Sequence, residues 1–114
     1  MTAGYTKLYD WVMEKKELTL NEKLVYCRVL RWQGNDCYES NARMGAGLGI
    51  HGRTVQRCVE ALVEKQWLKR FLVNKRFRVL LPHPDQMAAG PLFIKNFGVT
   101  AIKRIVYYSM KKVG

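Results

Sequence analysis

Two arginines and a glutamine near the middle of the chain have the spacing of a surface that could read nucleic-acid bases. Arg53 and Arg57 are four residues apart with Gln56 beside them, so in a helix the three side chains share one side. A guanidinium can donate two parallel hydrogen bonds to guanine, and a side-chain amide can pair similarly with adenine. Thr54 and the backbone amides at the start of such a helix could bind a phosphate. The pattern therefore predicts binding to nucleic acid.

Residue types that commonly hold metals or act as nucleophiles are few and scattered. His51 and His83 lie far apart in the sequence and belong to no metal-binding motif. The three cysteines, Cys27, Cys37 and Cys58, lack C-x-x-C spacing, and we expect buried, reduced thiols in a cytoplasmic protein. These patterns predict that the chain holds no metal.

Two further motifs could suggest chemistry, but neither is complete. Gly45, Gly47 and Gly49 alternate without the G-K-[ST] of a phosphate-binding loop. The adjacent Tyr107 and Tyr108 could suggest a DNA-nicking tyrosine, yet on an amphipathic helix such residues more often pack or form interfaces. We therefore expect no enzymatic activity, no catalytic residue and no cofactor.

Positive charge is concentrated in the middle and at the end of the chain. Of the net charge of +11, residues 1–38 contribute little, with six Lys/Arg against five Asp/Glu. Residues 39–81 carry nine Lys/Arg against three Asp/Glu, and residues 82–114 carry five against one. A localised positive field favours a polyanion, because neutralising phosphates releases condensed counterions. The alternative is a charge that only keeps the protein in solution.

The arginines and the glutamine fall on a helix predicted at about residues 52–66. Val55, Val59 and Leu62 recur at helical spacing and form its buried side, with Cys58 alongside. Glu60 lies three residues after Arg57, and we expect the two to form an ion pair. The helix thus has one apolar and one polar side.

A period of two follows, which predicts a β-hairpin at about residues 69–81. Phe71 and Val79 belong to apolar positions that alternate with basic ones on the two strands. Asn74-Lys75 is the expected tight turn between them. The basic residues at its flanks and tip are Lys69, Arg70, Lys75, Arg76 and Arg78.

The elements before this region form the rest of the predicted core. A short amphipathic helix is expected at about Thr6–Lys15, and a capping box begins a central helix at Thr19-Leu20-Asn21-Glu22. After Gly34-Asn35-Asp36, a turn, Cys37 and Tyr38 could form a short strand. Ser40 or Asn41 then offers an N-cap for a helix at about Asn41–Leu48, which ends at Gly49 in a positive-φ turn.

Beyond the hairpin, Pro82-His83-Pro84-Asp85 predicts a linker, and Val99–Val113 an amphipathic helix. Ile102, Val106 and Met110 could pack on the core, or pair across a two-fold axis with a second copy. Tyr5, Leu8 and Val12 offer the same two possibilities at the other end. We expect no membrane association, because charges interrupt the apolar stretches.

The segment Leu48–Arg57, LGIHGRTVQR, resembles the pattern L-G-[VI]-S-x-R-T-V-x-R of winged helix-turn-helix DNA-binding domains. Leu62–Leu68 resembles the segment that leads into the wing, and Leu18–Tyr26 the first helix of such domains in plasmid and phage replication proteins and small bacterial regulators. Two residues depart from the pattern. His51 stands where a small capping residue is usual, and Gln66 stands at a usual glycine, where it must take a left-handed conformation or end the helix differently.

The resemblance implies an α+β, mostly helical fold: a three-helix core with a β-hairpin wing, and extra N- and C-terminal helices. Residues 1–81 would form this domain, and 82–114 the linker and last helix. The expected partner is double-stranded DNA, in replication initiation, transcription control or plasmid maintenance or transfer, with a homodimer possible. The alternative is an interaction module inside a replication or conjugation complex. The residues predicted to contact DNA are Ser40, Asn41, Arg43, Gly52, Arg53, Thr54, Gln56, Arg57, Lys69, Arg70, Asn74, Lys75, Arg76 and Arg78.

Overall fold

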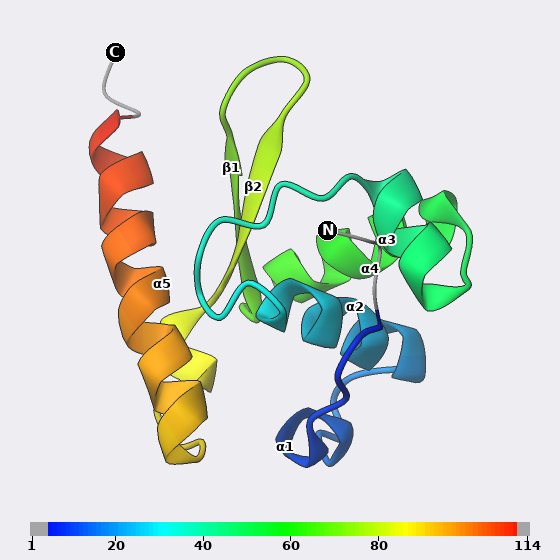
Figure 1. Cartoon of the computed structure of the whole chain (residues 1–114), viewed down its shortest axis with the longest axis horizontal. Coiled ribbons are helices and arrows are strands. Elements are labelled where there is room, and N and C mark those ends of the chain that lie inside the picture. The colour runs from blue at the N-terminus through cyan, green and yellow to red at the C-terminus, as the bar shows by residue number, and fades with distance from the viewer. Residues whose placement is uncertain (1–4, 112–114) are drawn as a thin grey trace.

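The computed structural model describes residues 5–111 and shows an α+β chain of helices and one antiparallel hairpin (Figure 1). The coarse fold class predicted from the sequence is therefore confirmed. The elements in chain order are α1 (Asp10–Met13), α2 (Leu20–Leu30), α3 (Asn41–Leu48), α4 (Gly52–Glu64), β1 (Leu68–Leu72), β2 (Arg78–Pro82), the 3₁₀ turn η1 (Pro84–Gln86) and α5 (Leu92–Lys111).

Helix α2 forms the centre of the core. Its predicted capping box is confirmed: Glu22 N–H donates to Thr19 Oγ1 over 3.2 Å, and Thr19 N–H donates to Glu22 Oε1 over 3.0 Å. The apolar residues of its last two turns, from Val25 to Leu30, are fully buried. They pack against α4 on one side and β2 on another, so α2 connects the helical part to the hairpin.

The connection between α3 and α4 is a tight turn that depends on two glycines. Gly49 has the expected left-handed conformation, with φ of 75°. Ile50 N–H donates to the Gly45 carbonyl over 3.0 Å, and a Cβ on Gly45 would lie 2.4 Å from the Ile50 carbonyl oxygen. Gly45 weakens α3 as an isolated helix but is required for this turn to close.

The hairpin strands pair in a regular antiparallel register that places Leu72 opposite Arg78 and Leu68 opposite Pro82. The predicted two-residue turn at Asn74-Lys75 is wrong, because residues 73–77 form a longer connection. The Asn74 side chain closes it by accepting hydrogen bonds from two backbone amides that follow, so no glycine is needed.

A third segment extends the sheet by one residue. Cys37 and Leu80 exchange two backbone hydrogen bonds in an isolated antiparallel bridge. The short strand predicted at Cys37-Tyr38 is thus present only at Cys37. Cys27, Cys37 and Cys58 are all buried free thiols, as expected, and burial raises the pKa of Cys37 to about 12.

Helix α5 begins seven residues earlier than the sequence predicted, at Leu92 rather than Val99, and Val113 lies outside the described residues. Figure 1 shows α5 beside the hairpin, which extends past the helices between α5 and α3. The chain packs tightly against α5 at Gly34, where a Cβ would lie 2.2 Å from the Phe97 carbonyl oxygen. The predicted linker contains η1, which packs against α5.

Helix α1 is shorter than predicted, spanning Asp10–Met13 rather than Thr6–Lys15. Residues 5–9 lie outside any helix, and Thr6 Oγ1 instead accepts a hydrogen bond from the guanidinium of Arg28 over 3.0 Å. That guanidinium is fully buried and pairs with both carboxylate oxygens of Glu39, at 2.7 and 2.9 Å. The tertiary contact of Thr6 replaces the first helical turn that the apolar spacing favoured.

In the part of the chain that the structure describes, none of the helices is long and apolar enough to cross a membrane.

Candidate nucleic-acid interface

The outer side of α4 presents the three residues predicted to read bases. Arg53, Gln56 and Arg57 are exposed, while the opposite side of the helix is buried against the core. The expected ion pair between Arg57 and Glu60 is wrong: both side chains are described, and no salt bridge joins them. An exposed pair at this spacing gains little free energy, so both side chains stay in solvent. Arg57 is therefore free to bind another group.

The N-terminus of α4 has no side-chain cap. His51 has extended backbone angles, but its imidazole makes no capping hydrogen bond. The first amides of α4, including those of Gly52 and Arg53, thus have no side-chain acceptor, and the helix dipole favours an anion there. Thr54 lies beside them and is half-buried. The departure at His51 therefore leaves the start of α4 without a side-chain cap. At the other end of α4, Gln66 adopts the strained left-handed conformation, with φ of 68°.

A groove of about 570 Å³ lies between the start of α3 and the outer part of the hairpin. Half of the predicted contact residues line it: Ser40, Asn41, Arg43, Asn74, Lys75, Arg76 and Arg78. Four of these are cations, and no Asp or Glu lines the groove. Two segments more than thirty residues apart in sequence therefore combine into one basic concave surface, which we call the basic groove.

Several hydrogen bonds fix the walls of the basic groove. Ser40 Oγ caps α3 by accepting from Arg43 N–H over 3.2 Å, so Ser40 rather than Asn41 is the N-cap. The Arg78 guanidinium donates to the Glu39 carbonyl over 3.2 Å, which ties the hairpin to the residue before the α3 cap. Burial lowers the pKa of Arg78, and a nearby anion would offset that effect. Asn41 Oδ1 is buried without a hydrogen-bond partner.

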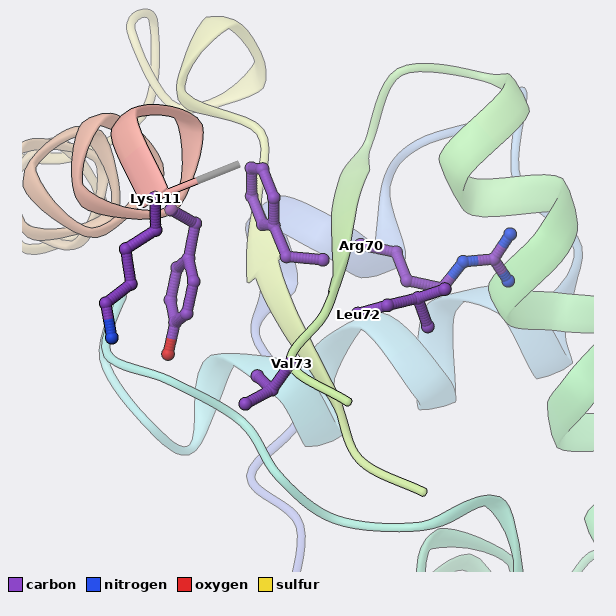
Figure 2. Close-up of a pocket in the computed structure, with 6 residues that line it drawn as sticks. Arg70, Leu72, Val73 and Lys111 are labelled. Carbon is purple, nitrogen blue, oxygen red and sulfur yellow. The ribbon is translucent and has the colours of Figure 1, made fainter. Parts of the chain in front are cut away.

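The basic residues of the hairpin do not share one face. Lys69 lies on the side covered by α5, where it lines a separate depression with Ile102 and Val106. Figure 2 shows Arg70 and Leu72 pointing away from Lys111 of α5, on the opposite side of β1. Lys69 is thus separated from the other predicted contacts, whereas Arg70 faces the α4 side of the molecule.

Asp36, just before the Cys37 bridge, is bonded to α5, and α5 in turn packs against the opposite face of the hairpin. The Arg104 guanidinium donates to both Asp36 oxygens, at 2.8 and 2.9 Å, and the hydroxyls of Tyr38 and Tyr108 also donate to this carboxylate. Burial would raise the pKa of Asp36, but these hydrogen bonds outweigh it and lower the pKa below its usual value. The Tyr108 ring stacks on Phe71 of β1, with centroids 5.4 Å apart. We call Asp36 and its three donors, Arg104, Tyr38 and Tyr108, the Asp36 cluster.

Between the outer edge of β1 and the end of α5 is a pocket of about 440 Å³ (Figure 2). Its lining combines the Tyr108 ring with residues 70–73 of the strand and Lys111. The ammonium group of Lys111 lies 5.1 Å from the Tyr107 ring centre. This pocket is distinct from the basic groove, although Leu72 lines both.

Sequence reasoning missed three residues of the basic groove: Tyr38, Leu72 and Phe77. Phe77 belongs to the alternating apolar positions of the strands, which favoured burial, whereas Leu72 falls on the side of Arg70 and Asn74; both are exposed. The available signal was their position next to the connection at 73–77, where a hairpin extends beyond its supporting helices. Tyr38 is placed in the groove by the chain turn at Gly34 and gave no local signal.

Among the residues described, no three His, Cys, Asp or Glu side chains gather into a group that could hold a metal ion. Comparison with protein-family models, with curated proteins and with solved structures finds no match to this chain.

Proposed function

We propose that this protein is a winged helix-turn-helix domain that binds double-stranded DNA without catalysing a reaction. The order of its elements supports this assignment: α2, the Cys37 bridge, α3, a tight turn, α4 and then the hairpin. In such a domain α4 is the recognition helix and the hairpin is the wing. Helices α1 and α5 are additions to this arrangement.

The observation that carries the proposal is the basic groove. It brings the N-terminus of α3 and the basic part of the wing together on one concave surface that no carboxylate lines. A surface that only kept the protein soluble would have no reason to collect cations from separate elements around a cavity. A DNA backbone fits this arrangement, because Arg43, Lys75 and Arg76 could each neutralise a phosphate.

The proposed mode of binding assigns a separate task to each element. Helix α4 enters the major groove, where Arg53 and Arg57 bind guanines and Gln56 binds adenine. The uncapped amides of α4, together with Ser40 and Arg43, hold the adjacent backbone. The wing then lies along the neighbouring minor groove. Only the α4 contacts distinguish one base sequence from another.

The test is a titration of the protein into labelled duplexes by fluorescence anisotropy, at several salt concentrations. Arg53→Ala/Arg57→Ala should weaken binding to a selected site by about 2–6 kcal/mol, and binding to random duplex much less. The matched control is Lys16→Ala/Lys95→Ala, which removes two exposed cations that do not line the groove and should change affinity little. Absence of duplex binding at low salt, or equal effects of the two double variants, would contradict the proposal.

The biological setting belongs to the same proposal. We propose that the protein acts in the cytoplasm in replication initiation, transcription control or plasmid maintenance or transfer. The base sequence selected by the protein from a random duplex library would separate them, because origins and operators differ in how their half-sites repeat.

A second function is favoured by exposed apolar residues along α5. Val99, Ile102, Val106 and Met110 are exposed along one side of this helix, where an interacting protein or a second copy could bind. Sedimentation at several concentrations would show self-association. A monomer that fails to bind DNA would favour the interaction-module alternative.

A further inference from the structure

The tip of the wing exposes large apolar side chains. Leu72 is 80% exposed, Phe77 55% and Val73 48%, whereas the apolar positions nearer the base of the hairpin, Leu68 and residues 79–81, are buried. All charged residues between 68 and 82 are basic. An apolar tip on a basic hairpin costs solubility and stability unless it enters an environment away from water. Because the charged residues around the tip are all basic, we expect the tip to enter an apolar environment next to a polyanion.

The tip is held in a defined shape. Asn74 Oδ1 accepts hydrogen bonds from the amides of Arg76 and Phe77, at 2.8 and 3.0 Å, and Val73 N–H donates to the Phe77 carbonyl over 2.9 Å. These bonds fix the backbone that carries Phe77. Leu72 pairs in register with Arg78, whose guanidinium is bonded to the Glu39 carbonyl. The backbone at Leu72 and at Phe77 is thus held in place by hydrogen bonds.

The base of the wing is supported on both faces. On one face, Phe71 stacks on Tyr108 of α5, which the Asp36 cluster holds in place. On the other face, Leu80 lies in the core and its backbone pairs with Cys37. Because both faces are packed, the hairpin keeps a fixed position relative to the helices. Its tip can therefore stay in place against DNA, which an unsupported hairpin could not do.

The apolar tip and the cations share one surface. Leu72 and Phe77 line the basic groove together with Lys75, Arg76 and Arg78. If DNA phosphates bind in the groove, Leu72 and Phe77 lie next to the bases that are attached to those phosphates. Apolar residues in this position can enter between base pairs in the minor groove and partly unstack them.

We propose that Leu72 and Phe77 form a wedge that inserts between base pairs and kinks the DNA on which the wing sits. This inference rests on the proposed function. The preferred sites would be TA or CA/TG steps, because pyrimidine–purine steps unstack most easily. The wedge gives the protein a bending activity in addition to sequence reading, and a preference at bases that it does not hydrogen-bond.

The experiment uses the full chain and a duplex of about 30 base pairs that contains the selected site. Energy transfer between dyes on the duplex ends reports bending, and 2-aminopurine in the TA step under the wing reports unstacking. The test variant is Leu72→Ser/Phe77→Ser. The control, Leu92→Ser, removes a side chain that is 75% exposed at the start of α5 and lines neither the tip nor the basic groove. Circular dichroism and thermal melting check that each variant is folded.

At saturating protein, we expect the natural chain and the α5 control to bend the duplex by about 20–90° and to raise the 2-aminopurine signal. The tip variant should bind the same duplex but lose both signals. Normal binding of an unbent duplex by the natural chain would overturn the wedge and leave the proposed function standing. Bending by the tip variant would also overturn it.

Two other outcomes separate the wedge from its alternatives. Failure of the natural chain to bind any duplex overturns the wedge and the proposed function together. Sedimentation with phosphatidylserine vesicles that is abolished in the tip variant, without DNA bending, overturns the wedge and assigns the tip to a membrane surface. No sedimentation with these vesicles is expected from the natural chain.

Discussion

The two faces of the hairpin have the same local sequence character but different surroundings. The face that carries Lys69, Phe71 and Val79 is covered by α5 and fixed by the Asp36 cluster. The face that carries Arg70, Leu72 and Arg78 contributes to the core at its base and opens outward into the basic groove. Basic residues occur on both faces, so position against α5, rather than charge, separates structural from candidate binding residues.

This comparison indicates that one face of the hairpin stabilises the fold and the other is available for binding. Val79 and Leu81 are fully buried but lie outside the main core cluster, whereas Leu80 between them belongs to it. The start of α5 joins the main core through Ile94, whereas Val79, Leu81 and Ala101 are buried outside it and form a second, smaller packing layer. Changes in this layer should affect stability first and DNA binding only indirectly. Changes on the open face should do the reverse.

The largest expected effect is from Gly34→Ala. Its Cβ would lie 2.2 Å from the Phe97 carbonyl oxygen at a φ of +93°, so α5 would have to move away from the turn that carries Asp36. We expect a loss of about 3 kcal/mol in unfolding free energy, measured by denaturant titration. The control is Gly49→Ala, which has a φ of +75° but no atom within 4 Å. This variant should lose only about 1–2 kcal/mol, and an equal loss in both would contradict the importance of the α5 contact.

The second expected effect is from Arg104→Ala. This change leaves the largely buried Asp36 carboxylate with only hydroxyl donors, and removes the guanidinium stacked over Tyr107 and Tyr108. The Arg104 side chain is partly exposed, so we expect a moderate loss of about 1–2 kcal/mol in unfolding free energy. Lys103→Ala on the same helix is the matched control and should be close to neutral. DNA affinity at a temperature where both variants are folded should be unchanged.

The third prediction compares adjacent basic residues on opposite faces. Arg70→Ala should weaken duplex binding by about 1 kcal/mol and reduce its salt dependence. Lys69→Ala should leave binding unchanged, because Lys69 lies against Ile102 and Val106 of α5. Anisotropy titrations at two salt concentrations measure both. Equal losses would show that the α5 face also meets DNA.

The smallest expected effect is a pH dependence from Asp36. Its folded pKa lies below the unfolded value, so the ionised carboxylate stabilises the fold above about pH 4 and this stabilisation disappears as the pH falls through the folded pKa. Melting temperatures of the natural chain and Asp36→Asn should therefore differ at pH 7 and converge in acid. A constant difference across this range would contradict the role of the charge.

Local patterns in the sequence predicted much of the fold. The capping box at Thr19 and the two sides of α4 follow from hydrogen bonds and spacings within a few residues, and both are present. The alternation in the hairpin predicted the strands, but not their longer connection, because closure depends on how the Asn74 side chain is oriented. The first turn of the expected N-terminal helix is missing because Thr6 bonds to Arg28, twenty-two positions away.

The sequence by itself determined which side of α4 is polar, because helical periodicity is local and the apolar positions leave Arg53, Gln56 and Arg57 outside. It also determined that the hairpin is basic. Only the tertiary structure decided which basic residues meet in one groove and which lie under α5. Residues such as Asp36 and Arg104 are distant in sequence, and their pairing depends on how whole elements pack. Alternation along a strand assigns a side chain to one of two faces but does not say what covers each face.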